Sequence, residues 1–559
     1  MLVYRPHRSH SPLSMHRFSW NVSLCIIACL SPQPVFAQSD STEPLKTADS
    51  RPGVDKYKDA TRGDLLFSDR VHAIQIEISE SAMREVEADH RPYGRTKLTI
   101  NGETFLSTGL KLKGAAGSYR HFDEKPAFTI NLDKFRKKQS YDGIDKFHLN
   151  NAAQDETFLH EWLGSEMFKA IGYPHPRVGH AWVTLNDGEK RLYVVRENYN
   201  PKLLSRFFAD ANGNLYDGGF LQDIDAELEK DAGDGDDERL DLGKLRDALS
   251  SEDFSERLTH VPQLVDMDRF MTFMAMERLL CHWDGYSCNT NNYRLYFDPE
   301  SGKAVFLPHG MDQLFGGLDM DMFEHGSPML SSLVIGSNQW RQKYRQVSQK
   351  VYEKLTKIDW AQLIDERGRI LRMEIDSVPH DETHGFIDRI EDLKERVKER
   401  FRILKDQLAA EEPSPTKIAL NTPMPLSDWY ENKDRDEIEV RIPESNRKEK
   451  IRINVPKEGE GYGGIERSEL VTSGTYKFSG RFRLSSAQAF EDAEETMVWK
   501  LSNNEEWVRM DNTDGWQDFS IETKVIEDQK RLVMGIAIRA KRGLLVIDSD
   551  SLKLTKTAE

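Results

Sequence analysis

The stretch that decides the fold is His282-Trp283-Asp284-Gly285-Tyr286-Ser287-Cys288-Asn289. It follows residues 267–280, which are rich in apolar side chains and show the spacing of a helix. A hairpin is predicted over 291–307, and its second strand ends in Pro308-His309-Gly310-Met311-Asp312. The local order is therefore a helix, a polar loop, a hairpin and a second carboxylate at a strand end.

The polar loop carries the spacing H-x-D-x-x-x-x-N, which protein kinases use in their catalytic loop. There the Asp takes or orients the proton of the acceptor hydroxyl, and the Asn five residues later binds a metal ion. Asp284 and Asn289 fill these two positions, and Asp312 stands where kinases place a further metal-binding Asp after a hairpin. Hard divalent ions prefer such oxygen ligands. Spacing alone leaves one alternative open, in which Asp284 and Asn289 only cap turns.

Several other stretches share their order along the chain with one known family. They are GLKLKG at 109–114, KPAFTINLDK at 125–134, DGIDKFHLNN at 142–151, VVRENY at 194–199 and GNLYD at 213–217. With the 282–316 block, they resemble the CotH kinase family, and the resemblance runs from about Val71 to Leu408. It implies a two-lobed, atypical protein-kinase-like domain of the α+β class. It also implies transfer of phosphate from ATP, with Mg²⁺ or Mn²⁺, to Ser or Thr of secreted or surface proteins.

The resemblance assigns roles position by position. It makes Asp284 the catalytic-loop Asp, and Asn289 and Asp312 the metal ligands. This chain departs from the family at one point, because many members read P-W-D-x-D where this chain has His309-Gly310 before the final Asp. One acidic side chain is therefore absent, which puts the affinity for metal in question.

The resemblance also assigns residues to the nucleotide, namely Lys125, Lys111, Lys113, Glu166 and Glu197. Lys125 is the first choice for a phosphate-contacting lysine, with Lys111 and Lys113 as alternatives. Glu166, on a helix predicted over 155–171, is expected to pair with that lysine, and Glu161 is an equal alternative. Glu197 lies where the segment between the lobes would approach adenine.

The N-terminus has the features of a secretory signal. Residues 1–37 contain three arginines and no acid, then a short apolar run over 20–30, and a polar stretch begins after Ala37. We expect cleavage near Ala37 and a secreted, periplasmic or cell-surface protein. Three alternatives remain open: a start at Met15, a lipoprotein signal at Cys29, and a disordered tail.

Composition sets the limits for the whole chain. Its 559 residues are 38% hydrophobic and 31% charged, which is typical of globular proteins. The net charge of −17 argues against a nucleic-acid partner, and no stretch has the roughly 20 apolar residues of a membrane-spanning helix. Beyond the signal only Cys281 and Cys288 remain, either as one small disulfide loop or as two thiols. The acidic run 223–238 is expected to be a solvated surface insertion.

The texture of the sequence changes near residue 411. We expect an extended segment over 38–65, the CotH-like kinase domain over 66–410 and a linker over 411–417. Residues 418–559 contain many short strand patterns, which predict an all-β sandwich resembling jelly-roll or carbohydrate-binding domains.

Two functions of different classes follow from these expectations. The first is an exported Ser/Thr kinase. The alternative is a non-catalytic surface protein with the kinase fold that binds a polysaccharide or a protein partner.

Overall fold

The computed structural model describes residues 64–559 except 90–91, 116, 235–238, 252, 325, 376–384, 413, 434, 444–449, 458–460, 489–495, 502–503, 509–511, 514 and 527–530. The signal expected over 1–37 therefore lies outside the described residues, as does most of the segment 38–65. Two compact units emerge, one formed by residues 64–335 with 339–410 and the other by Gly336–Asn338 with Glu411–Glu559.

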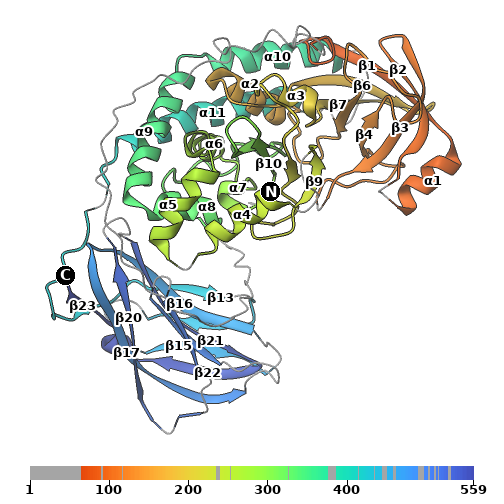
Figure 1. Ribbon diagram of the computed structural model, residues 1–559. Coiled ribbons are helices and arrows are strands. Elements are labelled where there is room, and N and C mark those ends of the chain that lie inside the picture. Colours follow the sequence, from red (N-terminus) through yellow and green to blue (C-terminus); the bar gives the residue numbers. More distant parts are fainter. Residues whose placement is uncertain are drawn as a thin grey trace. The chain divides into compact units, whose positions relative to one another are not determined.

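The first unit begins with a closed seven-stranded barrel (Figure 1). Its strands are β1 (Val71–Ile78), β2 (Gly94–Ile100), β3 (Glu103–Lys113), β4 (Ala127–Asn131), β5 (Lys146–Asn150), β6 (Val178–Leu185) and β7 (Lys190–Glu197). They pair in the order β1-β2-β3-β4-β5-β7-β6, and the barrel closes through parallel pairing of β1 with β6. The hairpin expected at Asn101-Gly102 joins β2 to β3.

Alternation along the strands fills the barrel. In β1, Ile74, Ile76 and Ile78 are buried, so this strand shows the period of two that its sequence predicts. Strand β7 serves two cores, because Tyr193 and Val195 pack inside the barrel. Leu192 and Val194 of the same strand pack against the helices instead.

The rest of this unit is a helical half with a small sheet. Its helices are α1 (Glu80–Ala88), α2 (His160–Ile171), α3 (Pro201–Leu204), α4 (Leu240–Leu249), α5 (Phe254–Leu264), α6 (Met267–Leu279), α7 (Tyr286–Asn289), α8 (Met329–Gly336), α9 (Asn338–Leu355), α10 (Trp360–Ile375) and α11 (Phe386–Ala409). The sheet has the order β11-β10-β8-β9, from β8 (Leu215–Asp217), β9 (Glu229–Ala232), β10 (Tyr293–Asp298) and β11 (Lys303–Pro308). Helix α1 alone lies against the barrel strands β2 and β3.

Helix α6 is buried on all sides, as a helix that is apolar around most of its circumference must be. It leads directly into the polar loop 282–289. Helix α11 crosses behind this junction, and the buried Arg400 donates to the carbonyl oxygens of Arg278 (2.7 Å) and Leu279 (3.2 Å). The end of α6 is thereby fixed by a side chain from the last helix of the unit.

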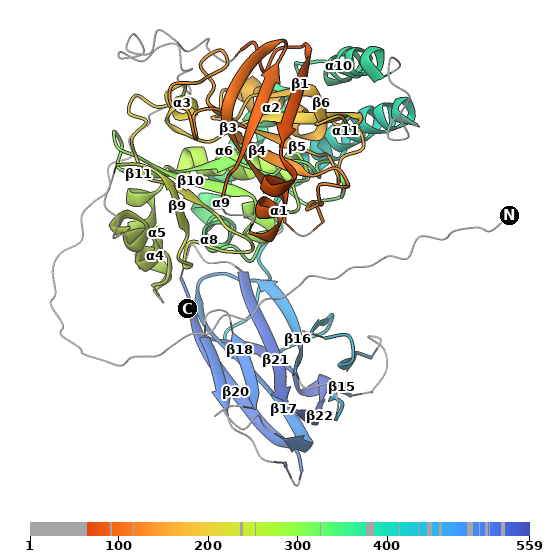
Figure 2. The same ribbon diagram turned by 90° about the vertical axis from the view of Figure 1, so that its right-hand side faces the viewer.

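The second unit consists of two antiparallel sheets that share one hydrophobic core (Figure 2). One sheet contains β12 (Met424–Pro425), β23 (Lys553–Ala558), β17 (Gly474–Gln488), β22 (Arg542–Ile547), β15 (Ile451–Val455), β14 (Glu439–Arg441) and β20 (Gln517–Val525). The other contains β13 (Tyr430–Lys433), β16 (Gly461–Leu470), β21 (Arg531–Ala540), β18 (Met497–Leu501) and β19 (Asn504–Val508). Trp429 and Trp499 belong to the core, whereas Trp516 is exposed.

The chain is thus α+β, as its sequence predicts. No helix in the described ranges is long and apolar enough to cross a bilayer.

Candidate functional site

One buried carboxylate holds the loop between α6 and α7. The carboxylate of Glu277 accepts hydrogen bonds from the backbone N–H groups of Tyr286 (3.0 Å) and Ser287 (2.7 Å). Burial raises the pKa of Glu277 to about 7, although these two donors favour its ionised form. The loop is therefore anchored from beneath by the helix that precedes it.

Three amides surround the carboxylate of Asp284. Asn289 Nδ2 donates to Oδ1 at 2.9 Å, Asn292 Nδ2 donates to Oδ2 at 2.7 Å, and Asn291 Nδ2 reaches both oxygens at 3.1 Å. The contact between Asp284 and Asn289 is the one that their spacing predicts. Because Asn289 uses its nitrogen on Asp284, its amide oxygen is the atom left for a cation.

The segment 308–312 lies against this loop. The Nε2 atom of His282 lies 3.0 Å from the carbonyl oxygen of Gly310. The side chain of Asn292 fills the space beside Gly310. A Cβ atom at position 310 would lie 2.2 Å from Asn292 Oδ1, and the φ of +56° is one that few residues other than glycine adopt. The acidic side chain that many family members carry here would have no room in this chain.

Asp312 lies among buried charges. Burial, with Glu161 as the nearest like charge, raises its pKa to about 7, and Lys113 opposes this shift. Lys113 Nζ donates to Asn150 Oδ1, and Asn150 Nδ2 donates to Glu161 Oε2, so one amide links the lysine of β3 to the glutamate of α2. Burial lowers the pKa of Lys113 to about 8, with Arg196 adding to the effect.

A cavity of about 260 Å³ opens beside this cluster. It is lined by five cationic residues, Lys111, Lys113, Lys146, Arg196 and Arg294, and by two acidic ones, Asp217 and Asp231. Arg294 pairs with both acids, at 2.5 Å and 3.3 Å. The remaining excess of positive charge suits an anionic ligand.

Two buried donors in the cavity wall lack partners. Arg196 Nη2 donates to His309 Nε2 at 3.1 Å, so the neutral ring of His309 carries its hydrogen on Nδ1. Among the described residues neither Arg196 Nη1 nor His309 Nδ1 makes a hydrogen bond. These donors, with the surrounding cations, fit the oxygens of a polyphosphate.

The described residues contain no cluster of three or more His, Cys, Asp or Glu side chains placed to hold a metal ion. Mg²⁺ is commonly bound through one or two carboxylates together with the phosphates of a substrate. Asp312 and the amide oxygen of Asn289 fit that kind of shared site, in which the nucleotide supplies the other ligands.

Not every residue assigned to the nucleotide is at this cluster. Lys125, the first choice, lies over the rings of Phe158 (4.8 Å) and Tyr193 (5.5 Å) and lines a different cavity. Glu166 pairs with Lys169 on its own helix at 3.0 Å. The lysine–glutamate link is instead made by the alternatives, Lys113 and Glu161.

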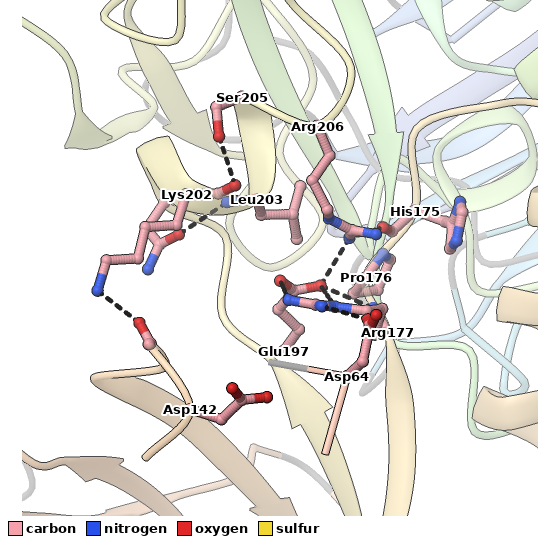
Figure 3. Close-up of polar contacts among 12 residues, drawn as sticks. Asp64, Asp142, His175, Pro176, Arg177, Glu197, Lys202, Leu203, Ser205 and Arg206 are labelled. Atoms are coloured by element: carbon pink, nitrogen blue, oxygen red, sulfur yellow. Dashed lines mark hydrogen bonds and ion pairs between the residues drawn. The ribbon is translucent and has the colours of Figure 1, made fainter. Parts of the chain in front are cut away.

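Glu197 is placed differently from the expectation as well (Figure 3). Its carboxylate accepts from Arg177 and Arg206, each at 2.6 Å, and from the backbone N–H of Arg177 at 2.9 Å. The next two residues, Asn198 and Tyr199, line the cavity in its place. Glu197 therefore ties the end of β7 to the chain around it.

Two further expectations are settled by the local structure. Cys281 and Cys288 are both free thiols, so no disulfide braces the loop. Asp223, expected to be solvated, is buried, and it accepts hydrogen bonds from Tyr286 Oη (3.0 Å) and the backbone N–H of Met329 (2.8 Å). The correction follows from the position of α7, which needs a buried acceptor beside Tyr286.

Known proteins are similar to this chain in sequence. The Inner spore coat protein H of Bacillus subtilis (strain 168) is 22% identical over 329 residues, covering 52% of this chain and 86% of that protein. The Invasin CotH7 of Rhizopus delemar is 27% identical over 221 residues, and the match spans 35% of each protein. The chain thus spans only about a third of that invasin's length.

Solved structures show more distant likenesses. A family 35 carbohydrate binding module from Clostridium thermocellum matches 24% of this chain and 98% of its own length, at 17% identity and a TM-score of 0.17. A likeness of this size does not establish a fold.

The family model described as CotH kinase protein matches residues 110–404, more than half of the chain. This range contains Asp284 with its three amides, the half-buried Asp312 and the Lys113–Glu161 link, and the chain therefore belongs to the CotH kinase protein family.

Proposed function

We propose that this chain is an exported CotH-type protein kinase that transfers the γ-phosphate of ATP, with Mg²⁺ or Mn²⁺, to Ser or Thr of secreted or surface proteins. The observation that carries the proposal is the chain of contacts from Lys113 through Asn150 to Glu161, next to Asp312. Kinases use such a lysine–glutamate pair and a metal-binding Asp around the phosphates.

The division of labour follows from the positions of the side chains. Lys113, Arg196 and His309 offer donors to phosphate oxygens in the cavity of about 260 Å³. Asp312 and Asn289 would hold the divalent ion, which neutralises phosphate charge when it is bound. Asp284, fixed by three amides, orients the acceptor hydroxyl and takes its proton.

Phosphoryl transfer requires little beyond phosphate donors, a bound metal ion and a proton acceptor. Its transition state is stabilised mainly by positioning and by fixed charges, so a rigid set of donors is the principal requirement. The hydrogen bonds of the three asparagines to Asp284 and the left-handed backbone at Thr290 and Asn292 hold the loop in this conformation.

Export is supported by two independent features. Residues 1–37 have the pattern of a secretory signal, and the relatives are named as a spore coat protein and as invasins. Both names describe proteins of a cell or spore surface, and a protein kinase at such a place would act on its neighbours there.

A second candidate is a non-catalytic protein that binds a polysaccharide or a protein partner at the surface. Gly310 favours it, because Asn292 occupies the space of the acidic side chain that many family members carry. The exposed Trp516 adds some support, since Arg481 and Lys450 lie 5.4 Å and 5.8 Å from its ring and could accompany an acidic sugar.

One assay separates the two candidates. The full chain is incubated with γ-labelled ATP, Mn²⁺ or Mg²⁺ and two generic protein acceptors, one basic and one acidic, beside the Asp312→Ala variant. Label that depends on Asp312 supports the kinase. No label, together with no metal-dependent ATP binding in calorimetry, would reject the kinase and leave the surface-binding protein.

A further inference from the structure

A second basic cavity lies outside the cleft that we assign to the nucleotide. It has a volume of about 390 Å³, and its charged lining is Arg120, Lys125, Arg191 and Arg389 against Glu124 and Glu156. The chain as a whole carries a net charge of −17, so a local excess of cations is a distinct feature. Such a surface attracts anionic groups.

This cavity continues towards the reaction centre. A neighbouring cavity of about 300 Å³ shares Arg389 with it and also contains Arg396. Its walls include Trp283 and Gln313, which are the sequence neighbours of Asp284 and Asp312. Trp283 is 45% exposed although it is a large aromatic residue beside a buried loop. We call the two cavities together the acceptor groove.

The loop between the two cavities is held rigidly. Asn151 Nδ2 donates to the carbonyl oxygens of Ser118 and Lys125, both at 2.9 Å. Ala152 and Phe158 have φ angles of +54° and +59°, which strain a residue other than glycine. A loop that keeps two such residues presents its walls in a fixed shape.

The same loop connects the groove to Asp312. Asp155 Oδ2 accepts a hydrogen bond from the backbone N–H of His160 at 2.8 Å. The ring nitrogen Nδ1 of His160 in turn lies 3.1 Å from the carbonyl oxygen of Asp312. A ligand in the groove therefore lies against the structure that positions Asp312.

The cations of the groove differ in their surroundings. Arg120 donates to two carbonyl oxygens, of Gly117 (3.1 Å) and Tyr119 (2.7 Å), which do not cancel its charge. Lys125 lies over two aromatic rings. Arg389 is 3.6 Å from Glu156, and Arg396 is 3.0 Å from Asp392, so the acids of the groove offset only part of the positive charge.

We propose that the acceptor groove binds the polypeptide acceptor and selects Ser or Thr flanked by anionic side chains. This rests on the proposed function, because an acceptor has meaning only for a kinase. The aromatic face of Trp283 would contact the chain near the reacting hydroxyl, and the arginines would contact flanking carboxylates or phosphates. Lys125 thereby acts on the acceptor and not on the nucleotide.

Binding to the full chain tests the proposal without catalysis. Fluorescence anisotropy is measured with three labelled peptides of one sequence around a single Ser, with Glu, Gln or Lys at the flanking positions. We expect the Glu peptide to bind about tenfold tighter than the Gln peptide, and the Lys peptide to bind most weakly. A fourth peptide with phosphoserine flanks shows whether phosphate or carboxylate is the better source of charge.

Substitutions locate the effect. Arg191→Gln with Arg389→Gln should weaken the Glu peptide about tenfold and leave the Gln peptide nearly unchanged. Arg402→Gln is the matched control, because Arg402 lies on the same α11 helix and pairs only with Glu399 and Asp406 near the surface. Unchanged thermal unfolding of each variant confirms that it is folded.

Two outcomes would overturn the groove. One is equal binding of the Glu and Lys peptides, and the other is a loss of affinity in Arg402→Gln as large as in the double variant. Failure of the proposed function is recognised separately, by the absence of ATP binding and phosphate transfer. Charge-selective peptide binding in that case would uphold the groove as a binding site for acidic polypeptides.

Discussion

The two basic sites of the first unit, the cleft of about 260 Å³ and the acceptor groove, place their lysines in different environments. In the cleft, Lys113 is linked through Asn150 to Glu161, and desolvation of its amino group lowers its pKa to about 8. In the acceptor groove, Lys125 lies over Phe158 and Tyr193 at the wall of a more open cavity. The difference is the basis of the two roles that we propose, with Lys113 at the phosphates and Lys125 at the acceptor.

The sharpest way to separate the cavities is to remove Asp312. We expect Asp312→Asn to lower phosphate transfer by about a thousandfold or more, because the divalent ion that would neutralise the phosphates loses its carboxylate ligand. The affinity for an acidic peptide should stay the same. Labelled-phosphate transfer and peptide anisotropy on the same preparation measure the two effects. Equal losses in both would mean that the cavities are not functionally distinct.

Exchanging each lysine for methionine compares the cavities directly. Lys113→Met should reduce kcat about a hundredfold at saturating peptide, since it removes the link to Glu161 beside the phosphates. Lys125→Met should raise the KM for an acidic peptide a few-fold and leave the KM for ATP unchanged. If Lys125→Met instead raised the KM for ATP, the prediction from the sequence that Lys125 contacts the phosphates would be supported.

The anchoring Glu277 supports the loop that carries Asp284, and it makes stability depend on pH. Its folded-state pKa of about 7 lies above the ordinary value of 4.5. Its contribution to stability is therefore complete below pH 4.5 and is lost as the pH rises to about 7. In the Glu277→Gln variant the side chain cannot ionise, so this variant should not lose stability from this group as the pH rises.

Urea unfolding of the wild type and of Glu277→Gln at pH 5 and pH 8 measures the effect. The stability of the wild type relative to the variant should fall by about 2 to 3 kcal/mol between these values. A relative stability that stays constant over this range would show that Glu277 has an ordinary pKa in the folded chain. Glu353→Gln on the surface of α9 provides the control.

The smallest effect is expected at the contact between Gly310 and Asn292. Gly310→Ala should destabilise the chain by about 1 to 2 kcal/mol, because a Cβ would meet Asn292 Oδ1 at 2.2 Å and the φ is positive. Adding Asn292→Ala should recover part of the loss, which a double-mutant cycle of unfolding free energies would detect. Strict additivity would indicate that only the backbone angle matters.

Much of this architecture is readable from the sequence. The alternation in β1 and the apolar face of α11, from Phe386 to Leu404, reflect the simple periods of strands and helices. The contact of Asp284 with Asn289 is equally local, since the two residues lie on one short loop. Such features need only neighbouring residues and one buried face.

The long-range choices could not be made in the same way. Lys111 and Lys113 share one face of β3, so only the three-dimensional surroundings show that Lys113 meets Asn150. Glu161 and Glu166 lie on one predicted helix, and here a signal existed. Glu161 precedes the apolar pair Trp162-Leu163 and is buried with it, whereas Glu166 pairs with Lys169 at the surface.

The hydrogen bonds from Arg400 to the carbonyl oxygens of Arg278 and Leu279 have a consequence for folding during synthesis. Arg400 is synthesised about 120 residues after Arg278 and Leu279, which directly precede the loop. A ribosome or an export channel delivers the chain in order, so the loop stays incomplete until α11 has emerged. A kinase built this way would remain inert during its own synthesis and begin to work only when its domain has been delivered whole.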